Sequence, residues 1–157
     1  MVIPDGFTIR SGSIQDLALI VSHRRGMFSD MGYCDQSALD SMSSKFLPWL
    51  QAKMASGDYL AWFATAGDGT VAAGAGLWLM DWPPHMIGSS LRRGNIVNVF
   101  TAAPFRRQGL ARCLVETAVQ WCQENSIDTI ILHASDEGRH LYESLGFTAS
   151  NEMRIRK

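Results

Sequence analysis

The sequence has little of what would direct it to nucleic acid, a membrane or a metal. Its net charge is −1 at pH 7, so no basic field attracts nucleic acid or anionic lipid. No apolar run approaches membrane-spanning length, and the first residues lack the basic and apolar stretches of a signal peptide. No pair of histidines has the spacing of metal ligands. We therefore expect a cytoplasmic protein that binds no metal, no nucleic acid and no membrane.

Cysteine is also scarce. Cys34, Cys113 and Cys122 form an odd set with neither zinc nor redox spacing, which favours reduced thiols. Repeats, linkers and low-complexity tracts are absent. Hydrophobic residues make up 46% of the 157 residues and charged residues 18%, as in folded globular proteins. The chain therefore predicts one domain over residues 1–157 that can bury a full core.

The spacing of apolar residues predicts an α/β (α+β) fold. Alternating or continuous apolar runs predict strands at 7–10, 59–64, 71–80, 95–101, 129–133, 147–149 and 153–155. Helical spacing predicts helices at 13–31, 37–57, 110–123 and 138–145, with a kink or break at Pro48 in the second. The order β-α-α-β-β-β-α-β-α-β-β predicts a mixed, mostly antiparallel sheet flanked by helices. Because the run at 129–133 is nearly continuous in apolar residues, we expect it at the sheet centre, covered on both faces.

One turn in this pattern has the composition of a phosphate site. The stretch Phe105-Arg106-Arg107-Gln108-Gly109-Leu110-Ala111 follows a predicted strand and opens a predicted helix. The first N–H groups of a helix lack partners, and the helix dipole favours an anion there. Gly109 and Ala111 keep the turn narrow, so that backbone can approach a ligand. The spacing is neither a mononucleotide P-loop nor the three-glycine dinucleotide fingerprint.

The spacing Arg-x-x-Gly-x-Ala resembles the pyrophosphate-binding motif of the GCN5-related N-acetyltransferases, Arg/Gln-x-x-Gly-x-Gly/Ala. A second signature of that family resembles the stretch from His133-Ala134-Ser135 through Leu141-Tyr142 to Gly146-Phe147. The two signatures stand in the family's order, one helix and one strand apart, and the element order matches over nearly the whole chain. The N-terminal helices match only in type, so they say little about the acceptor.

The resemblance implies an acetyl-CoA-dependent N-acetyltransferase that acts on a small-molecule or peptide amine. It implies that the strand before the turn splays from its neighbour and offers backbone groups to the thioester and pantetheine, and that the turn holds the diphosphate. The implied cofactor-binding residues are Val99, Phe100, Thr101, Arg106, Arg107, Gln108, Gly109, Leu110, Ala111, Arg112 and Ser135. Ser135 stands where the family often has Asn. Tyr142 matches the usual general acid, and a phenol with a pKa of about 10 can protonate a thiolate at neutral pH.

Several alternatives stay open. Asp81, His85, Glu152 or water could accept the amine proton. An apolar acceptor pocket could draw on Phe28, Met31, Tyr33, Trp49 and Trp82, although such residues more often pack in a core. A non-catalytic acyl-CoA-binding sensor or interaction module would need the turn but not Tyr142, and a structural domain would need neither. Many relatives form homodimers, and the sequence leaves the oligomeric state open.

Overall fold

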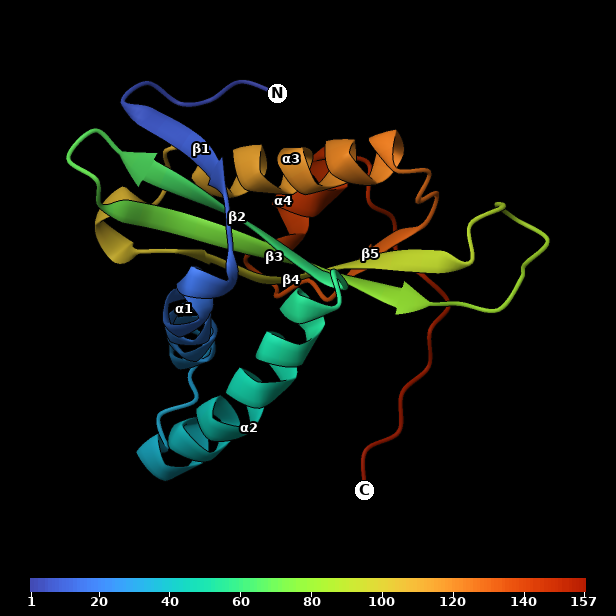
Figure 1. Ribbon diagram of the computed structural model, residues 1–157, viewed down its shortest axis with the longest axis horizontal. Coiled ribbons are helices and arrows are strands. Elements are labelled where there is room, and N and C mark those ends of the chain that lie inside the picture. The colour runs from blue at the N-terminus through green and yellow to red at the C-terminus, as the bar shows by residue number, and fades with distance from the viewer.

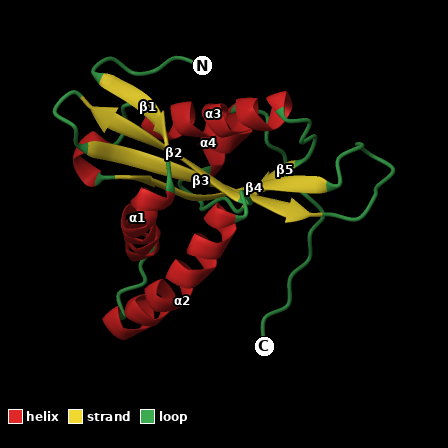
Figure 2. Ribbon diagram, in the orientation of Figure 1, coloured by secondary structure: helices red, strands yellow, loops and turns green.

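The computed structural model describes residues 1–157 and contains a five-stranded sheet between two layers of helices (Figures 1 and 2). The strands lie side by side in chain order: β1 (Phe7–Ser11), β2 (Tyr59–Ala66), β3 (Val71–Asp81), β4 (Arg92–Thr101) and β5 (Ile130–Leu132). The first four pair antiparallel, and β5 joins β4 in parallel. The predicted fold class, a mixed and mostly antiparallel sheet flanked by helices, is therefore confirmed.

Two helices cover each face of the sheet. Figure 1 shows α1 (Leu17–Asp30) and α2 (Gln36–Ala55) on one side, and α3 (Leu110–Glu124) and α4 (Arg139–Ser144) on the other. The larger core lies between the sheet and α3, around the fully buried Leu77, Leu110 and Leu114. A smaller core lies under α1 and α2, around Leu50 and Phe63. None of the helices is long and apolar enough to cross a membrane.

Local signals explain how α1 and α2 begin. Ser13 and Asp16 form the predicted capping box, at a 3₁₀ turn that leads into α1. Asp35, two residues before the predicted start, caps α2, because its carboxylate accepts a 3.2 Å hydrogen bond from Ala38 N–H. Of the kink or break predicted at Pro48, a break does not occur: α2 continues through it, with Phe46 and Leu50 both held in the smaller core.

Two glycines of β3 make room for side chains that cross the sheet toward β4. A Cβ atom at Gly74 would collide with the ring of His23, and one at Gly76 would collide with the phenol of Tyr59. Because glycine has no side chain, the ring of His23 from α1 fits over Gly74 and the ring of Tyr59 from β2 fits over Gly76. Both rings thereby reach the second half of β4, where the candidate site lies.

Two predictions about the C-terminal part are wrong. The apolar run at 129–133 forms a three-residue, half-buried strand at the sheet edge and not at its centre. The closing strands predicted at 147–149 and 153–155 are absent, and no helix or strand follows Ser144. A strand needs a neighbour and a face to cover. The short β5 offers little of either, and the Met153 and Ile155 side chains are 94% and 84% exposed.

Candidate active site

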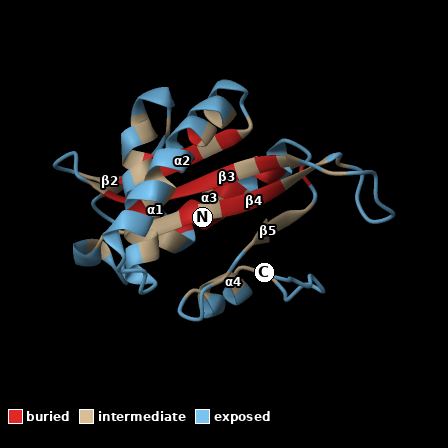
Figure 3. Ribbon diagram, turned by 90° about the horizontal axis from the view of Figure 1, so that it is seen from below, coloured by how far each residue is buried: buried red, intermediate tan, exposed pale blue.

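The sheet opens between β4 and β5. These strands pair only between Gly94–Ile96 and Ile130–Leu132, so residues 97–101 of β4 have a strand neighbour on the β3 side alone. Figure 3 shows β5 turning away from β4. The register with β3 shifts between Gly74 and Gly76, opposite Asn98, whose φ is +55°. A left-handed residue in a bulge bends its strand. The structure thus contains the splayed strand that the resemblance implies.

The turn after β4 presents a row of unpartnered backbone N–H groups. None of the N–H groups of residues 107–112 donates to an acceptor in the protein, and the first that does is that of Cys113, 3.1 Å from the Gly109 carbonyl oxygen. Gly109 occupies the N-cap of α3 with φ +81°, a conformation that favours glycine, and no side chain caps the helix. These N–H groups and the positive end of the α3 dipole both favour an anion at this turn.

The three arginines predicted for this site have different partners. Arg106 pairs with Asp30 of α1 at 2.7 Å and donates to the Thr101 carbonyl at 3.1 Å, so its side chain anchors the turn. Arg112 donates to the Ser144 hydroxyl at 2.5 Å and ties α3 to α4. Arg107 is exposed, has φ +60°, and makes no ion pair or side-chain hydrogen bond. Arg107 is therefore the arginine whose charge is available to a ligand.

Ser135 and Tyr142 meet around Gly138. The Ser135 hydroxyl accepts a 3.2 Å hydrogen bond from Gly138 N–H, which shapes the turn into α4. A Cβ atom at Gly138 would lie 3.0 Å from Tyr142 Cε2 and 3.3 Å from Ser135 Oγ. The Tyr142 ring also packs edge-on against Phe147, with centroids 6.1 Å apart. Burial raises the pKa of the Tyr142 phenol, so it stays protonated at neutral pH.

A buried polar group beneath the bulge was not predicted from the sequence. Arg24 of α1 donates from Nη1 to Asn98 Oδ1 at 2.7 Å, and Asn98 Nδ2 lies 2.7 Å from Tyr59 Oη. The Arg24 guanidinium lies over the rings of Phe28 and Phe46, at 5.0 and 4.7 Å from their centroids. Burial raises the pKa of Tyr59 to about 12, so the phenol is neutral. Asn98 within the apolar run of β4 was the sequence signal that could have drawn attention to this group.

Of the candidate bases, Asp81 and His85 lie away from the splayed strand. Asp81 pairs with Arg92, at the opposite end of β4 from Thr101. His85 is in the exposed loop after β3, where its Nδ1 accepts from Ile87 N–H. Glu152 is exposed and lies 3.7 Å from His133. The structure brings none of the three to the turn.

The residues predicted to form an apolar acceptor pocket do not all lie together in the structure. Phe28 contacts Arg24, and its ring packs edge-on against that of Tyr33, with centroids 5.5 Å apart. Trp49 packs in the smaller core against Trp78. Trp82 lies under Arg93 beyond the end of β3, and Met31 is exposed. Of the predicted set, Phe28 contacts Arg24 of the polar group under the bulge, and Trp49 packs edge-on against its Tyr59, with centroids 6.2 Å apart.

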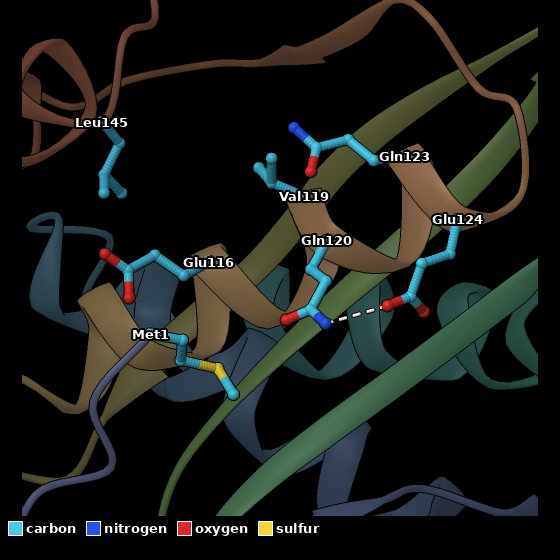
Figure 4. Close-up of a pocket in the computed structure, with 7 residues that line it drawn as sticks. All are labelled: Met1, Glu116, Val119, Gln120, Gln123, Glu124 and Leu145. Atoms are coloured by element: carbon cyan, nitrogen blue, oxygen red, sulfur yellow. Dashed lines mark hydrogen bonds between the residues drawn. The ribbon is translucent and has the colours of Figure 1, made fainter.

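A separate pocket lies on the outer face of α3 (Figure 4). Its lining includes Glu116, Gln120 and Glu124, together with Met1 and Leu145. Two carboxylates and no lysine or arginine side chain make it a poor fit for a diphosphate. Nowhere in the structure do three or more His, Cys, Asp or Glu side chains gather as metal ligands would.

Comparison with known proteins identifies the family. Residues 28–147 match the profile described as the Acetyltransferase (GNAT) family. A GCN5-related N-acetyltransferase from Ralstonia eutropha JMP134 is 33% identical to the chain, over 97% of this chain and 99% of its own, with a TM-score of 0.90. The fold and these matches place the protein among the acetyltransferases. The chain belongs to the GCN5-related N-acetyltransferase (GNAT) family, as its paired signatures predict.

Other solved structures share the fold. A predicted acetyltransferase from Clostridium acetobutylicum, determined with acetyl-CoA, is 25% identical over 96% of both chains, with a TM-score of 0.85. A glucosamine-6-phosphate N-acetyltransferase from Arabidopsis thaliana is 19% identical over 96% of this chain and 97% of its own, with a TM-score of 0.66. No curated protein matches the chain significantly.

Proposed function

We propose that the protein is an acetyl-CoA-dependent N-acetyltransferase that transfers an acetyl group directly to the amine of a small molecule or peptide. The row of unpartnered N–H groups at 107–112, next to the open edge of β4, carries the proposal. A diphosphate fits the positive end of α3, and an extended arm fits beside residues 97–101. The relative determined with acetyl-CoA supports the same assignment.

Some of the proposed cofactor-binding residues act through their backbone and others through their side chains. The N–H groups of Arg107 to Arg112 hold the diphosphate, Arg107 adds its charge, and Arg106 and Arg112 fix the turn to α1 and α4. Val99, Phe100 and Thr101 offer backbone groups to the pantetheine and the thioester. An N–H directed at the acyl oxygen would stabilise the negative charge that develops there. Ser135 contributes the turn that presents α4.

Tyr142 is the proposed general acid. The acceptor nitrogen attacks the thioester carbonyl carbon, the C–N bond forms, and the C–S bond breaks. The departing thiolate takes the proton of the Tyr142 hydroxyl, which burial keeps protonated. We propose that the amine gives its proton to water, since Asp81 and His85 lie away from the splayed strand and Glu152 is exposed beside His133.

We infer that residues 1–157 form one N-acetyltransferase domain. Related structures align over nearly their whole length with 96–97% of the chain. The three cysteines are free, which fits a reducing cytoplasm.

The deciding experiment measures thiol release from acetyl-CoA against amino acids, polyamines, aminoglycosides and peptides. Calorimetry of CoA binding accompanies it. Amine-dependent thiol release, with an acetylated product seen by mass spectrometry, supports the enzyme. Tight acyl-CoA binding without turnover of any amine would favour the non-catalytic sensor or interaction module. Absence of CoA binding by the folded protein would contradict both.

A further inference from the structure

We infer that the acceptor carries a carboxylate close to its amine, as an amino acid does, and that Arg24 binds this carboxylate. The inference rests on the proposed function, since it names the class of amine that the same site accepts. It starts from a half-buried arginine that has no carboxylate partner in the protein.

The two neighbouring arginines of α1, Arg24 and Arg25, differ in whether a carboxylate neutralises them. Arg25 is paired on the surface, with Asp40 at 2.7 Å and Gln36 at 2.8 Å. Arg24 makes one hydrogen bond, to the neutral side-chain oxygen of Asn98. No carboxylate contributes to its surroundings, and the adjacent Tyr59 phenol is neutral. The positive charge of Arg24 beneath the bulge therefore has no negatively charged partner in the protein.

The Arg24 guanidinium keeps one donor that a carboxylate can reach. Nη1 is taken by Asn98, Nε is enclosed without an acceptor, and Nη2 makes no hydrogen bond and is not enclosed. A carboxylate can therefore accept a charge-assisted hydrogen bond from Nη2. The Phe28 and Phe46 rings hold the guanidinium in place. A half-buried charge without a partner is costly, and a bound carboxylate would supply the missing negative charge.

The position of Arg24 connects it to the proposed chemistry. Asn98, which holds Nη1, immediately precedes Val99, the first residue proposed to face the thioester. A ligand anchored on Arg24 thus lies beside the splayed half of β4, on the face covered by α1 and α2. An amine a few bonds from that carboxylate can reach the acyl carbon, whereas a long polyamine offers nothing to the arginine. The substrate class is therefore an amino acid or a similar small amine with a carboxylate.

The test compares the standard α-amino acids with their α-carboxamides, which differ only in the carboxylate. Calorimetry measures their binding to the CoA-loaded protein, and thiol release measures kcat/KM. Wild type is expected to favour the acid of at least one pair. Arg24→Gln should reduce that preference by roughly 10- to 100-fold, the value of a charged hydrogen-bond pair. Arg24→Lys should retain part of it, because lysine keeps the charge but not the planar fork.

Two further variants separate a ligand contact from a structural effect. Arg25→Gln removes the same charge one residue away and should leave the preference unchanged. Asn98→Asp places a carboxylate on Nη1, so it should neutralise Arg24 and remove the preference without removing the arginine. CoA binding by each variant confirms that it is folded.

The outcomes are distinct. Equal binding of acids and amides by the wild type, or a preference that survives Arg24→Gln, would overturn the inference. Stronger binding of phosphoethanolamine than of any amino acid would overturn the carboxylate assignment and indicate a phosphate. Acid-selective binding that depends on Arg24, without turnover, would support the inference and contradict the proposed catalytic function alone.

Discussion

Arg106 Nη2 and Asp30 Oδ2 lie 2.7 Å apart and join the last residue of α1 to the turn that precedes α3. The Nε of the same guanidinium donates to the Thr101 carbonyl, so one side chain contacts α1, β4 and the turn. The side chain of Arg107, the next residue, makes no hydrogen bond or ion pair with any of them. Two adjacent arginines of one motif therefore have different roles.

Replacing each arginine by Gln should separate these roles. Arg107→Gln is expected to weaken CoA binding about tenfold, the lower range for a charged hydrogen bond, without changing the free energy of unfolding. Arg106→Gln should lower the free energy of unfolding by at most about 1 kcal/mol, because the ion pair is half-exposed. Calorimetry with CoA and denaturant unfolding check both. A larger loss of stability in Arg107→Gln than in Arg106→Gln would reverse the assignment.

The charge of the ligand can be tested at Gly109. A Cβ atom there has room, since its nearest neighbour would be Pro4 Cγ at 3.8 Å, but the positive φ strains any side chain. Gly109→Ala and Gly109→Glu should therefore both lose roughly 1–2 kcal/mol of stability. Only Gly109→Glu should abolish CoA binding, because its carboxylate repels the diphosphate. Unchanged affinity in a folded Gly109→Glu protein would refute the phosphate site.

Tyr142→Phe tests the general acid. The substitution removes only the hydroxyl, so the ring keeps its packing against Gly138 and Phe147 and CoA affinity should be nearly unchanged. Turnover should fall by roughly 10²–10⁴-fold, the usual effect of losing a general acid. Burial raises the pKa of Tyr142. If deprotonation of Tyr142 lowers kcat at alkaline pH, the loss should therefore begin at a higher pH than for a free phenol. The Tyr142→Phe protein should not show this loss. A change in KM alone would make Tyr142 a positioning residue.

His23 should make stability depend on pH. Burial lowers its pKa from 6.5 to about 4, so between these values the unfolded chain binds the proton and the folded protein does not. Stability should therefore fall as the pH decreases through this window, by about 2 kcal/mol between pH 6.5 and pH 5. Urea unfolding at a series of pH values measures the slope, and His23→Gln should flatten it. If stability depends equally on pH in the wild type and in His23→Gln, the dependence comes from other groups.

The cysteines should differ in reactivity. Cys34 is exposed, whereas Cys113 and Cys122 are 1% and 0% exposed. Burial raises the pKa of Cys113, and it raises that of Cys122 to about 11. Iodoacetamide should label Cys34 alone in the native protein and all three residues in denaturant, as read by mass spectrometry. An intramolecular disulfide in the native protein would contradict this prediction.

The sequence predicted those features whose signals are local. Gly109 stands between a strand and an amphipathic helix, and Tyr142 stands a fixed distance before Gly146-Phe147, so neighbouring residues identified both. The alternation at 147–155 is also local, yet it gave strands that do not form, because pairing depends on a neighbour that β5 barely provides. Local patterns thus predicted the helices and strands better than they predicted which strands pair with each other.

The group around Arg24 depends on distant parts of the chain. Arg24 and Asn98 are 74 residues apart, and Asn98 and Tyr59 are 39 apart. In the sequence, Arg24-Arg25 is typical of a solvated helix face, and only the packing of α1 over the bulge distinguishes the two residues. The Gly76 position that admits Tyr59 carries no sequence signal of its own either.

The end of β4–β5 pairing at Ile96 divides β4 into two halves with different local stability. Amides from Gly94 to Ile96 belong to a stretch of strand that is paired on both edges, whereas those from 97 to 101 have one free edge. A pantetheine arm lying along that edge would take the place of the missing strand. Hydrogen exchange should then slow from Val97 to Thr101 when CoA binds, and the ligand would extend the cooperative core of the sheet into its own binding site.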